Sequence, residues 1–232
     1  MKTQDAYIHQ IIEKQARKWL MFSQAKKEQK AKAQPVIYIS RQPATGGHHV
    51  AAKVAELLQF DLFDRALLMK VAEDAKMSAH VVETLDEKSR SFLLDWMGAW
   101  AKDHLWFDDY LGSLMRVIGT IQRHGNAVIV GRGAGFIIPE GQCLRVRIIA
   151  PLEMRIQNEC EDKKIQADEA RKNVITLENE QNAFVQRYFD KDLNDPFNYH
   201  LMINMAKVSI VDAAATIAGL YRSWSSERKE HS

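Results

Sequence analysis

The sequence is poor in the features that mark secreted, disulfide-bonded and membrane-spanning proteins. It has only two cysteines, Cys143 and Cys160, which match neither a disulfide framework nor a metal-ligand spacing. No apolar run approaches the roughly 18 residues that span a bilayer, and the N-terminus lacks the apolar core of a secretory signal. We therefore expect a cytoplasmic protein with no membrane span and no metal held by protein side chains alone.

The chain after residue 34 also lacks an excess of basic residues. The formal net charge is only +2, and the basic excess lies in the first 34 residues, so that the rest of the chain is slightly acidic. Nucleic-acid-binding proteins more often carry a basic stripe across the folded surface, and we expect no nucleic-acid partner. The 232 residues, 46% hydrophobic and 27% charged, suit one soluble α/β domain with an appendage.

The appendage is residues 1–34, which we expect to be a helical leader with a basic linker. Its apolar residues recur at helical spacing: Ile8, Ile11, Ile12, Trp19 and Leu20. Such a helix either packs on the body or frays in solvent, or it is an arm for a homodimer or a protein partner. A basic amphipathic helix also permits binding at a membrane surface. The main domain would span residues 35–222, followed by a polar tail at 223–232.

Short apolar segments alternate with helical periodicity in the main domain. The predicted strands are residues 36–39, 127–130, 144–150 and 200–204, and residues 61–64 are a short second strand or a strand-like turn. Helical patterns follow the first two strands, fill most of 78–124, form two polar segments that meet near Gln166, and begin again at Ser209. This alternation predicts a mostly parallel sheet with helices on both faces, in which ligands bind at the carboxyl ends of the strands.

One strand end has the layout of a phosphate-binding loop but lacks its lysine. VIYISRQPATGGHHVAAKVAELL (36–58) runs from a strand through a glycine turn into a helix, which offers backbone N–H groups to an anion. The usual G-x-x-x-x-G-K-[ST] pattern is absent. The residues available for a phosphate are Ser40, Arg41, Thr45, Gly46, Gly47, His48 and His49. An ordinary tight turn remains the alternative.

A second strand end places an arginine between glycines. VIVGRGAGFII (128–138) puts Arg132 between Gly131 and Gly133, where a planar guanidinium can bind phosphate through two parallel hydrogen bonds. A dinucleotide-binding fingerprint would need a glycine at position 136, where this chain has Phe136. Arg155, one turn into the helix after the fourth strand, is the other candidate, although an isolated arginine there is more often a surface residue.

Aromatic residues are frequent between the second and third strands. They include Trp96, Trp100, Trp106, Phe107 and Tyr110. Such a stripe is more often core or partner contact than a cofactor site.

Five segments together resemble the cytidylate-kinase-like family, relatives of bacterial CMP kinase. They are ISRQPATGGHHVAAKVAELL, DLFDRALL, NAVIVGRGAGFII, APLEMRI and NDPFNYHLMIN, and the resemblance runs from about Val36 to Leu220. It implies a P-loop NTPase-like fold with a helical lid, and a kinase that transfers the γ-phosphoryl group of ATP, with Mg²⁺, to CMP or a similar small phosphorylated acceptor. Many members also lack the lysine.

The resemblance also implies roles for particular residues. Asp64 and Arg65, with Gly131 and Gly133, would bind the acceptor. Arg132 would approach the phosphoryl groups, and Arg155 would enter from the lid.

Two departures from the family pattern put activity in doubt. Ala44-Thr45 replaces the usual Gly-Ser, and Glu180-Gln181 stands where an arginine is expected. Arg187, nearly two turns along, is the substitute available. The alternative is therefore a catalytically weak nucleotide-binding relative with a regulatory or scaffold role.

Overall fold

The computed structural model describes residues 10–20, 35–103 and 108–230. Their contacts divide them into two compact units. The first unit contains the described part of the leader together with Arg65–Gly125, and the second contains Pro35–Asp64 and everything from Asn126 onward. Each unit is described by itself below.

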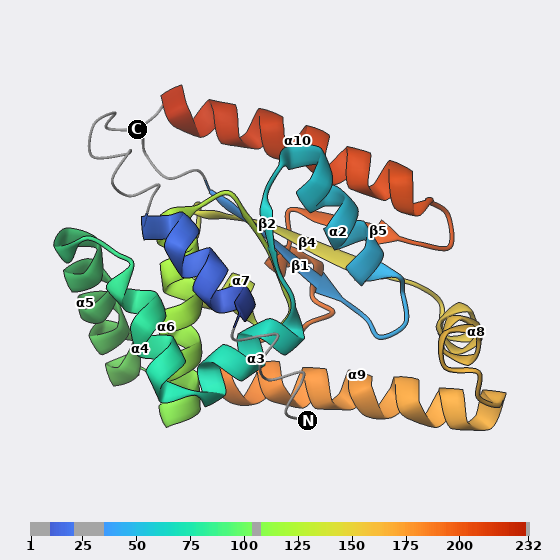
Figure 1. Cartoon of the computed structure of the whole chain (residues 1–232). Coiled ribbons are helices and arrows are strands. Elements are labelled where there is room, and N and C mark those ends of the chain that lie inside the picture. The colour runs from blue at the N-terminus through green and yellow to red at the C-terminus, as the bar shows by residue number, and fades with distance from the viewer. Residues whose placement is uncertain (1–9, 21–34, 104–107, 231–232) are drawn as a thin grey trace. The chain divides into compact units, whose positions relative to one another are not determined.

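All five predicted strands form, and they make one parallel sheet in the second unit (Figure 1). The strands are β1 (Val36–Arg41), β2 (Asp61–Phe63), β3 (Ala127–Val130), β4 (Cys143–Ile149) and β5 (Leu201–Asn204). They lie in the order β2-β3-β1-β4-β5. The predicted fold class is thereby confirmed. Because β1 lies between β3 and β4, the loop that follows it is flanked by the loops that follow its two neighbours.

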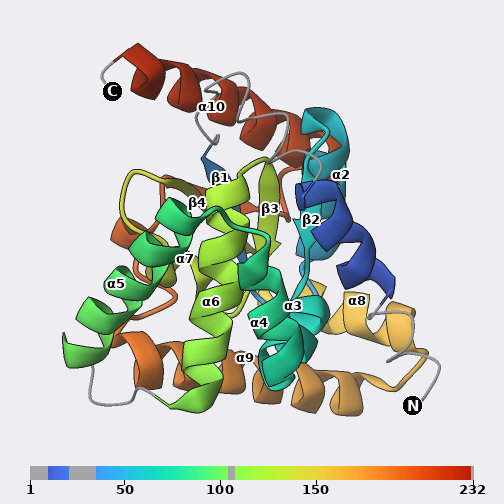
Figure 2. The same cartoon turned by 60° about the vertical axis from the view of Figure 1, so that its left-hand side comes forward.

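Two helices cover one face of this sheet. They are α2 (Gly47–Leu58) and α10 (Ile210–Glu230), which lie side by side in Figure 2. Alternate strand residues such as Ile37, Ile39 and Val146 point to these helices and are fully buried in a core that includes Val54 and Ile217. The helix α10 continues through 223–230, which was predicted as a polar tail.

A short helix, α7 (Ala134–Ile137), lies on the opposite face and was not predicted. It follows the Gly-Arg-Gly turn after β3, and its Gly135 packs directly on the ring of Tyr38 in β1. A Cβ atom added at Gly135 would lie 2.3 Å from the Tyr38 ring. The glycine is therefore needed for the close approach of α7 to the sheet.

The two polar helical segments form the predicted pair. They are α8 (Leu152–Lys163) and α9 (Ala167–Phe189), and the chain turns between them at Lys164, whose φ is 55°. Both lie beyond the carboxyl ends of β1 and β4 (Figure 1). This is the position expected of a lid over a site at that edge.

The first unit is helical throughout its described residues. The chain is helical at 10–20, and then forms α3 (Arg65–Glu73), α4 (Ala75–Glu83), α5 (Glu87–Asp103) and α6 (Asp109–His124). The helices α3, α4 and α5 all pack against α6. No described helix is long and apolar enough to cross a membrane.

The described part of the leader is a packed helix. Ile12, Ala16 and Trp19 are buried, and the Trp19 ring stacks on His124 at the end of α6, with centroids 4.4 Å apart. The packed form is therefore the one observed for residues 10–20. Ile8 and the linker, like Trp106 and Phe107 of the aromatic stripe, lie outside the described residues.

We predict opposite effects for the same substitution at two glycines of the second unit. Gly135→Ala should lower the free energy of unfolding by about 1–3 kcal/mol, because its Cβ overpacks against Tyr38. Gly219→Ala in α10, where a Cβ meets nothing within 4 Å, should raise it by about 0.5–1 kcal/mol. Urea unfolding measures both, and equal shifts in one direction would contradict the packing described.

Candidate functional site

Two predicted loops meet at the carboxyl edge of the sheet. Ile39 in β1 pairs with Val130 in β3, and the Gly131 amide donates to the Ile39 carbonyl at 3.2 Å. Arg41 lies between the loops: its Cβ would be 2.7 Å from a Cβ at Gly47, and its Nη1 2.9 Å from one at Gly131. Glycine at both positions lets the arginine pass between the two loops. The parallel register therefore brings the S-R and G-R-G motifs together.

The glycine turn after β1 begins α2 directly. Gly46 has φ 73° and is the residue before the helix, whose first turn has no acidic residue. The Thr45 hydroxyl donates to the Gln42 carbonyl at 2.9 Å and accepts from the Gly47 amide at 3.3 Å. Thr45 is buried, so its hydroxyl shapes the loop. The positive end of the α2 dipole faces the mouth of the loop, as an anion site requires.

Ala44 occupies a position that suits glycine. Its φ is 57°, in the left-handed region that costs a residue with a Cβ about 1–2 kcal/mol. The loop therefore keeps the conformation that a glycine would allow and stores strain in it. The Asn158 side chain of α8 stabilises this conformation by donating to the Ala44 carbonyl at 2.8 Å.

His48 and His49 lie in the exposed first turn of α2. Their rings are 3.7 Å apart, centroid to centroid. Partial desolvation lowers the pKa of His48, and His49 and Arg41 lower it further, while Asp162 acts in the opposite direction. The net lowering of its pKa favours the neutral form of His48.

Arg132 lies in a strained turn between the two glycines. Gly131, Arg132 and Gly133 have φ values of 79°, 53° and 62°, and a positive φ at a residue with a side chain is typical of functional sites. The Arg132 guanidinium lies over the ring of Phe184 in α9, 5.2 Å from its centroid. Gly133 packs on Phe189 of the same helix. The arginine is thus held between the turn and α9, and it is half-buried.

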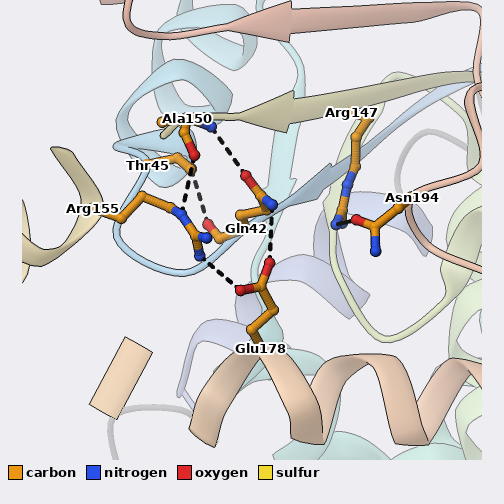
Figure 3. A network of polar contacts seen from close by, with 7 residues as sticks. All are labelled: Gln42, Thr45, Arg147, Ala150, Arg155, Glu178 and Asn194. Atoms are coloured by element: carbon orange, nitrogen blue, oxygen red, sulfur yellow. Dashed lines mark hydrogen bonds and ion pairs between the residues drawn. The ribbon is translucent and has the colours of Figure 1, made fainter. Parts of the chain in front are cut away.

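Arg155 is not free to bind a ligand in this structure. It is 5% exposed, its Nε donates to the Ala150 carbonyl at 3.1 Å, and its Nη1 pairs with Glu178 of α9 at 3.1 Å. The other Glu178 oxygen accepts from Gln42 at 2.9 Å. Figure 3 shows these contacts as one network that joins the loop after β1 to both lid helices. Sequence reasoning did not identify Gln42, Asn158 or Glu178.

Ser40 is also engaged by a residue that the sequence analysis did not single out. Its Oγ lies 2.6 Å from Nη1 of Arg147 in β4, the two residues being paired in the register of the sheet. Nη2 of Arg147 donates to Asn194 at 3.2 Å. Arg147 is 1% exposed. The sequence signal was the presence of Arg145 and Arg147 in a strand whose other residues are apolar, because parallel strands buried on both faces are usually apolar throughout.

Three other predicted residues lie after β2, at the start of α3 and on α9. Asp64 is exposed after β2, Arg65 begins α3 in the first unit, and Arg187 is exposed on α9 with its guanidinium over the ring of Tyr188. Glu180 is exposed, whereas Glu178 two residues earlier contacts the loop. The acid that matters for this edge is therefore Glu178.

The arrangement has the chemistry of an oxyanion site. A helix N-terminus, the guanidinium groups of Arg41 and Arg132, and a buried guanidinium behind Ser40 gather at one sheet edge. No three His, Cys, Asp or Glu side chains among the described residues gather as metal ligands. Phosphate groups are the ligands that such an edge suits.

The Arg155–Glu178 pair yields a stability prediction. Glu178→Ala should lower the free energy of unfolding by about 3 kcal/mol, because it leaves a buried guanidinium without its carboxylate. The control is Glu180→Ala on the same helix, an exposed change that should stay within about 0.5 kcal/mol. Similar values for the two variants in chemical unfolding would show that the pair does not stabilise the lid.

Ala44 yields a prediction of opposite sign. Ala44→Gly should raise the free energy of unfolding by about 0.5–1 kcal/mol, since glycine adopts positive φ without strain and this gain exceeds the added freedom of the unfolded chain. Ala52→Gly, on the exposed side of α2, should lower it by about 1 kcal/mol. Thermal unfolding of both variants measures the difference, and a destabilised Ala44→Gly protein would contradict the strain.

Known proteins resemble this chain in sequence and in fold. Residues 36–207 match the sequence model of the cytidylate kinase-like family. An uncharacterised protein from Eubacterium ventriosum superposes with a TM-score of 0.63 at 23% identity, over 82% of this chain and 99% of its own.

Two kinases of known structure are less similar. Shikimate kinase from Acinetobacter baumannii gives a TM-score of 0.45 at 15% identity, over 83% of this chain and 95% of its own. Gluconokinase from Sinorhizobium meliloti gives 0.48 at 12% identity, over 83% and 97%. A search of curated proteins finds no significant match. Because the family match extends over most of its length, the chain belongs to the cytidylate kinase-like family.

Proposed function

We propose that the protein is a nucleotide kinase that transfers the γ-phosphoryl group of ATP to CMP or a similar small phosphorylated acceptor. The observation that carries the proposal is the meeting of the two loops at Arg41. This side chain passes between Gly47 at the N-terminus of α2 and Gly131 at the end of β3. The loop after β1 would bind the donor phosphates, and the loop after β3 would bind the acceptor.

The chemistry asks the protein mainly to neutralise and align two polyanions. The N–H groups at the start of α2 would bind donor phosphate oxygens, and Arg41 and Arg132 would approach the transferring group from the two loops. No strong base is needed, because the acceptor phosphate already carries its nucleophilic oxygen. Mg²⁺ supplied with ATP would offset part of the charge of the donor phosphates.

The helices α8 and α9 would act as the lid. They contact the loop through Asn158 and Glu178, and the stacking of Arg132 on Phe184 joins the second loop to α9. A lid that covers the phosphates excludes water and limits wasteful hydrolysis of ATP. Arg155 would join the site only if it exchanged Glu178 for a phosphate oxygen.

A nucleotide-binding protein without turnover is the second candidate. The observations that favour it are Ala44-Thr45 in place of the usual Gly-Ser of the family and the engagement of Arg155 by Glu178. Such a protein would bind nucleotide at the same loop and act as a regulatory or scaffold partner. Binding through the leader, to a protein or to a second copy, remains a prediction, as does a cytoplasmic location.

A coupled assay of ADP release tests the proposal. It would use the full chain with ATP, Mg²⁺ and CMP, dCMP, UMP, AMP or GMP in turn, together with calorimetric titration of each nucleotide. ADP release that depends on the acceptor supports the kinase and names its substrate. Binding without turnover favours the second candidate, and neither binding nor turnover contradicts both.

The central prediction concerns Arg132. Arg132→Ala should lower turnover by about tenfold or more, because a guanidinium that stabilises the charge of the transferring group is lost. The control is Arg171→Ala, which removes an exposed arginine paired with Glu153 on the outside of the lid and should leave turnover unchanged. Steady-state kinetics with circular dichroism separates loss of function from loss of fold. Unchanged kinetics in Arg132→Ala would remove this residue from the site.

A further inference from the structure

We propose that Arg147 is a positioning residue that supplies, from behind the phosphate-binding loop, a fixed positive charge that compensates for the missing lysine. The inference rests on the proposed function, since it concerns the same loop. It assigns a role in phosphate binding to a side chain that is buried within the sheet.

The first observation is that Arg147 carries a charge in a place that excludes water. The side chain is 1% exposed, and burying a guanidinium without a counterion costs several kcal/mol. Its two described partners, Ser40 and Asn194, are neutral, and no described carboxylate lies within 4.0 Å of it. The buried Nε has no hydrogen-bond partner among the described residues. The protein therefore holds an uncompensated positive charge at this point.

The nearby ionisable groups do not neutralise that charge. Tyr38 and Tyr199 are close enough to interact with Arg147, but burial raises the pKa of both phenols, so they remain uncharged. Asp192 and Asp195 also act on Tyr199, but the described hydrogen bonds of the Arg147 guanidinium go to Ser40 and Asn194 and not to either carboxylate. The field of the guanidinium is thus not cancelled by a direct ion pair.

The second observation is the direction in which this charge acts. Nη1 of Arg147 donates to Ser40 at 2.6 Å, and Ser40 immediately precedes Arg41, which lies between the two loops. Arg41 and Arg147 both interact electrostatically with Tyr38. Two guanidinium groups therefore lie around the end of β1, and a buried charge acts over a longer distance than an exposed one because water does not screen it.

If Arg147 lowers stability but aids phosphate binding, its removal should affect the melting temperature and the phosphate affinity in different ways. Arg147→Met keeps most of the volume and removes the charge, so it should leave the melting temperature unchanged or raise it. The same variant should bind inorganic tripolyphosphate about tenfold more weakly than the wild type, because the loop loses one positive charge. A purely structural arginine predicts the reverse, which is a lower melting temperature and unchanged binding.

The strand itself offers a matched control. Arg145 lies two residues earlier on the same face of β4, is half-buried, and donates to the Ile138 carbonyl at 3.3 Å. Arg145→Met should bind tripolyphosphate as the wild type does. Arg147→Gln retains a side-chain donor without the charge, and should bind as weakly as Arg147→Met.

The experiment is calorimetric titration of each full-length variant with tripolyphosphate, alongside a thermal melt. Weak binding by the Met and Gln variants, with wild-type binding by Arg145→Met, supports the inference, and the Gln variant decides if the Met variant does not fold. Wild-type affinity in both neutral variants, or an equal loss of affinity in Arg145→Met, would overturn it while leaving the proposed function intact. A wild-type protein that binds no tripolyphosphate would overturn both.

Discussion

The parallel pairing of β1 between β3 and β4 is the constraint on which the rest of this structure depends. It sets Ile39 beside Val130 and Ser40 beside Arg147, so that three loops leave the sheet at the same edge. Residues distant in sequence then share one small region without any further device. The glycines complete the arrangement, because Gly47 and Gly131 leave room for a single arginine between the loops.

The arginines at this edge of the sheet differ in whether a carboxylate neutralises them. This difference supports the proposed function. Arg155 is neutralised by Glu178 and stabilises the contact between the lid and the loop. Arg147 has no such partner within the described residues. Arg132 is held in a strained turn against Phe184. A protein tolerates uncompensated charge and backbone strain together where function requires them, and a bound polyanion would relieve the electrostatic part.

Local patterns predicted the fold well and the side-chain partners poorly. All five strands were predicted, because apolar segments next to turn residues can be recognised in the sequence. The helix α2 and the break near Gln166 were predicted as well. The short α7 was missed because four residues show no periodicity. The pairing of Arg155 with Glu178 was not predicted, because Glu178 lies 23 residues away and no local rule connects the two. Glu180 was singled out because the family pattern has an arginine near that position. The side chain that contacts the loop is that of Glu178.

Phosphorus NMR of the full-length protein with ATP, Mg²⁺ and CMP tests the central claim most directly, because it distinguishes transfer from hydrolysis. The account predicts that the resonances of ADP and CDP grow together and in equal amounts, without inorganic phosphate. If another monophosphate is the true acceptor, its diphosphate should appear in the same way. ADP that appears only with inorganic phosphate, or a spectrum that does not change with any acceptor, would contradict a kinase at this edge of the sheet.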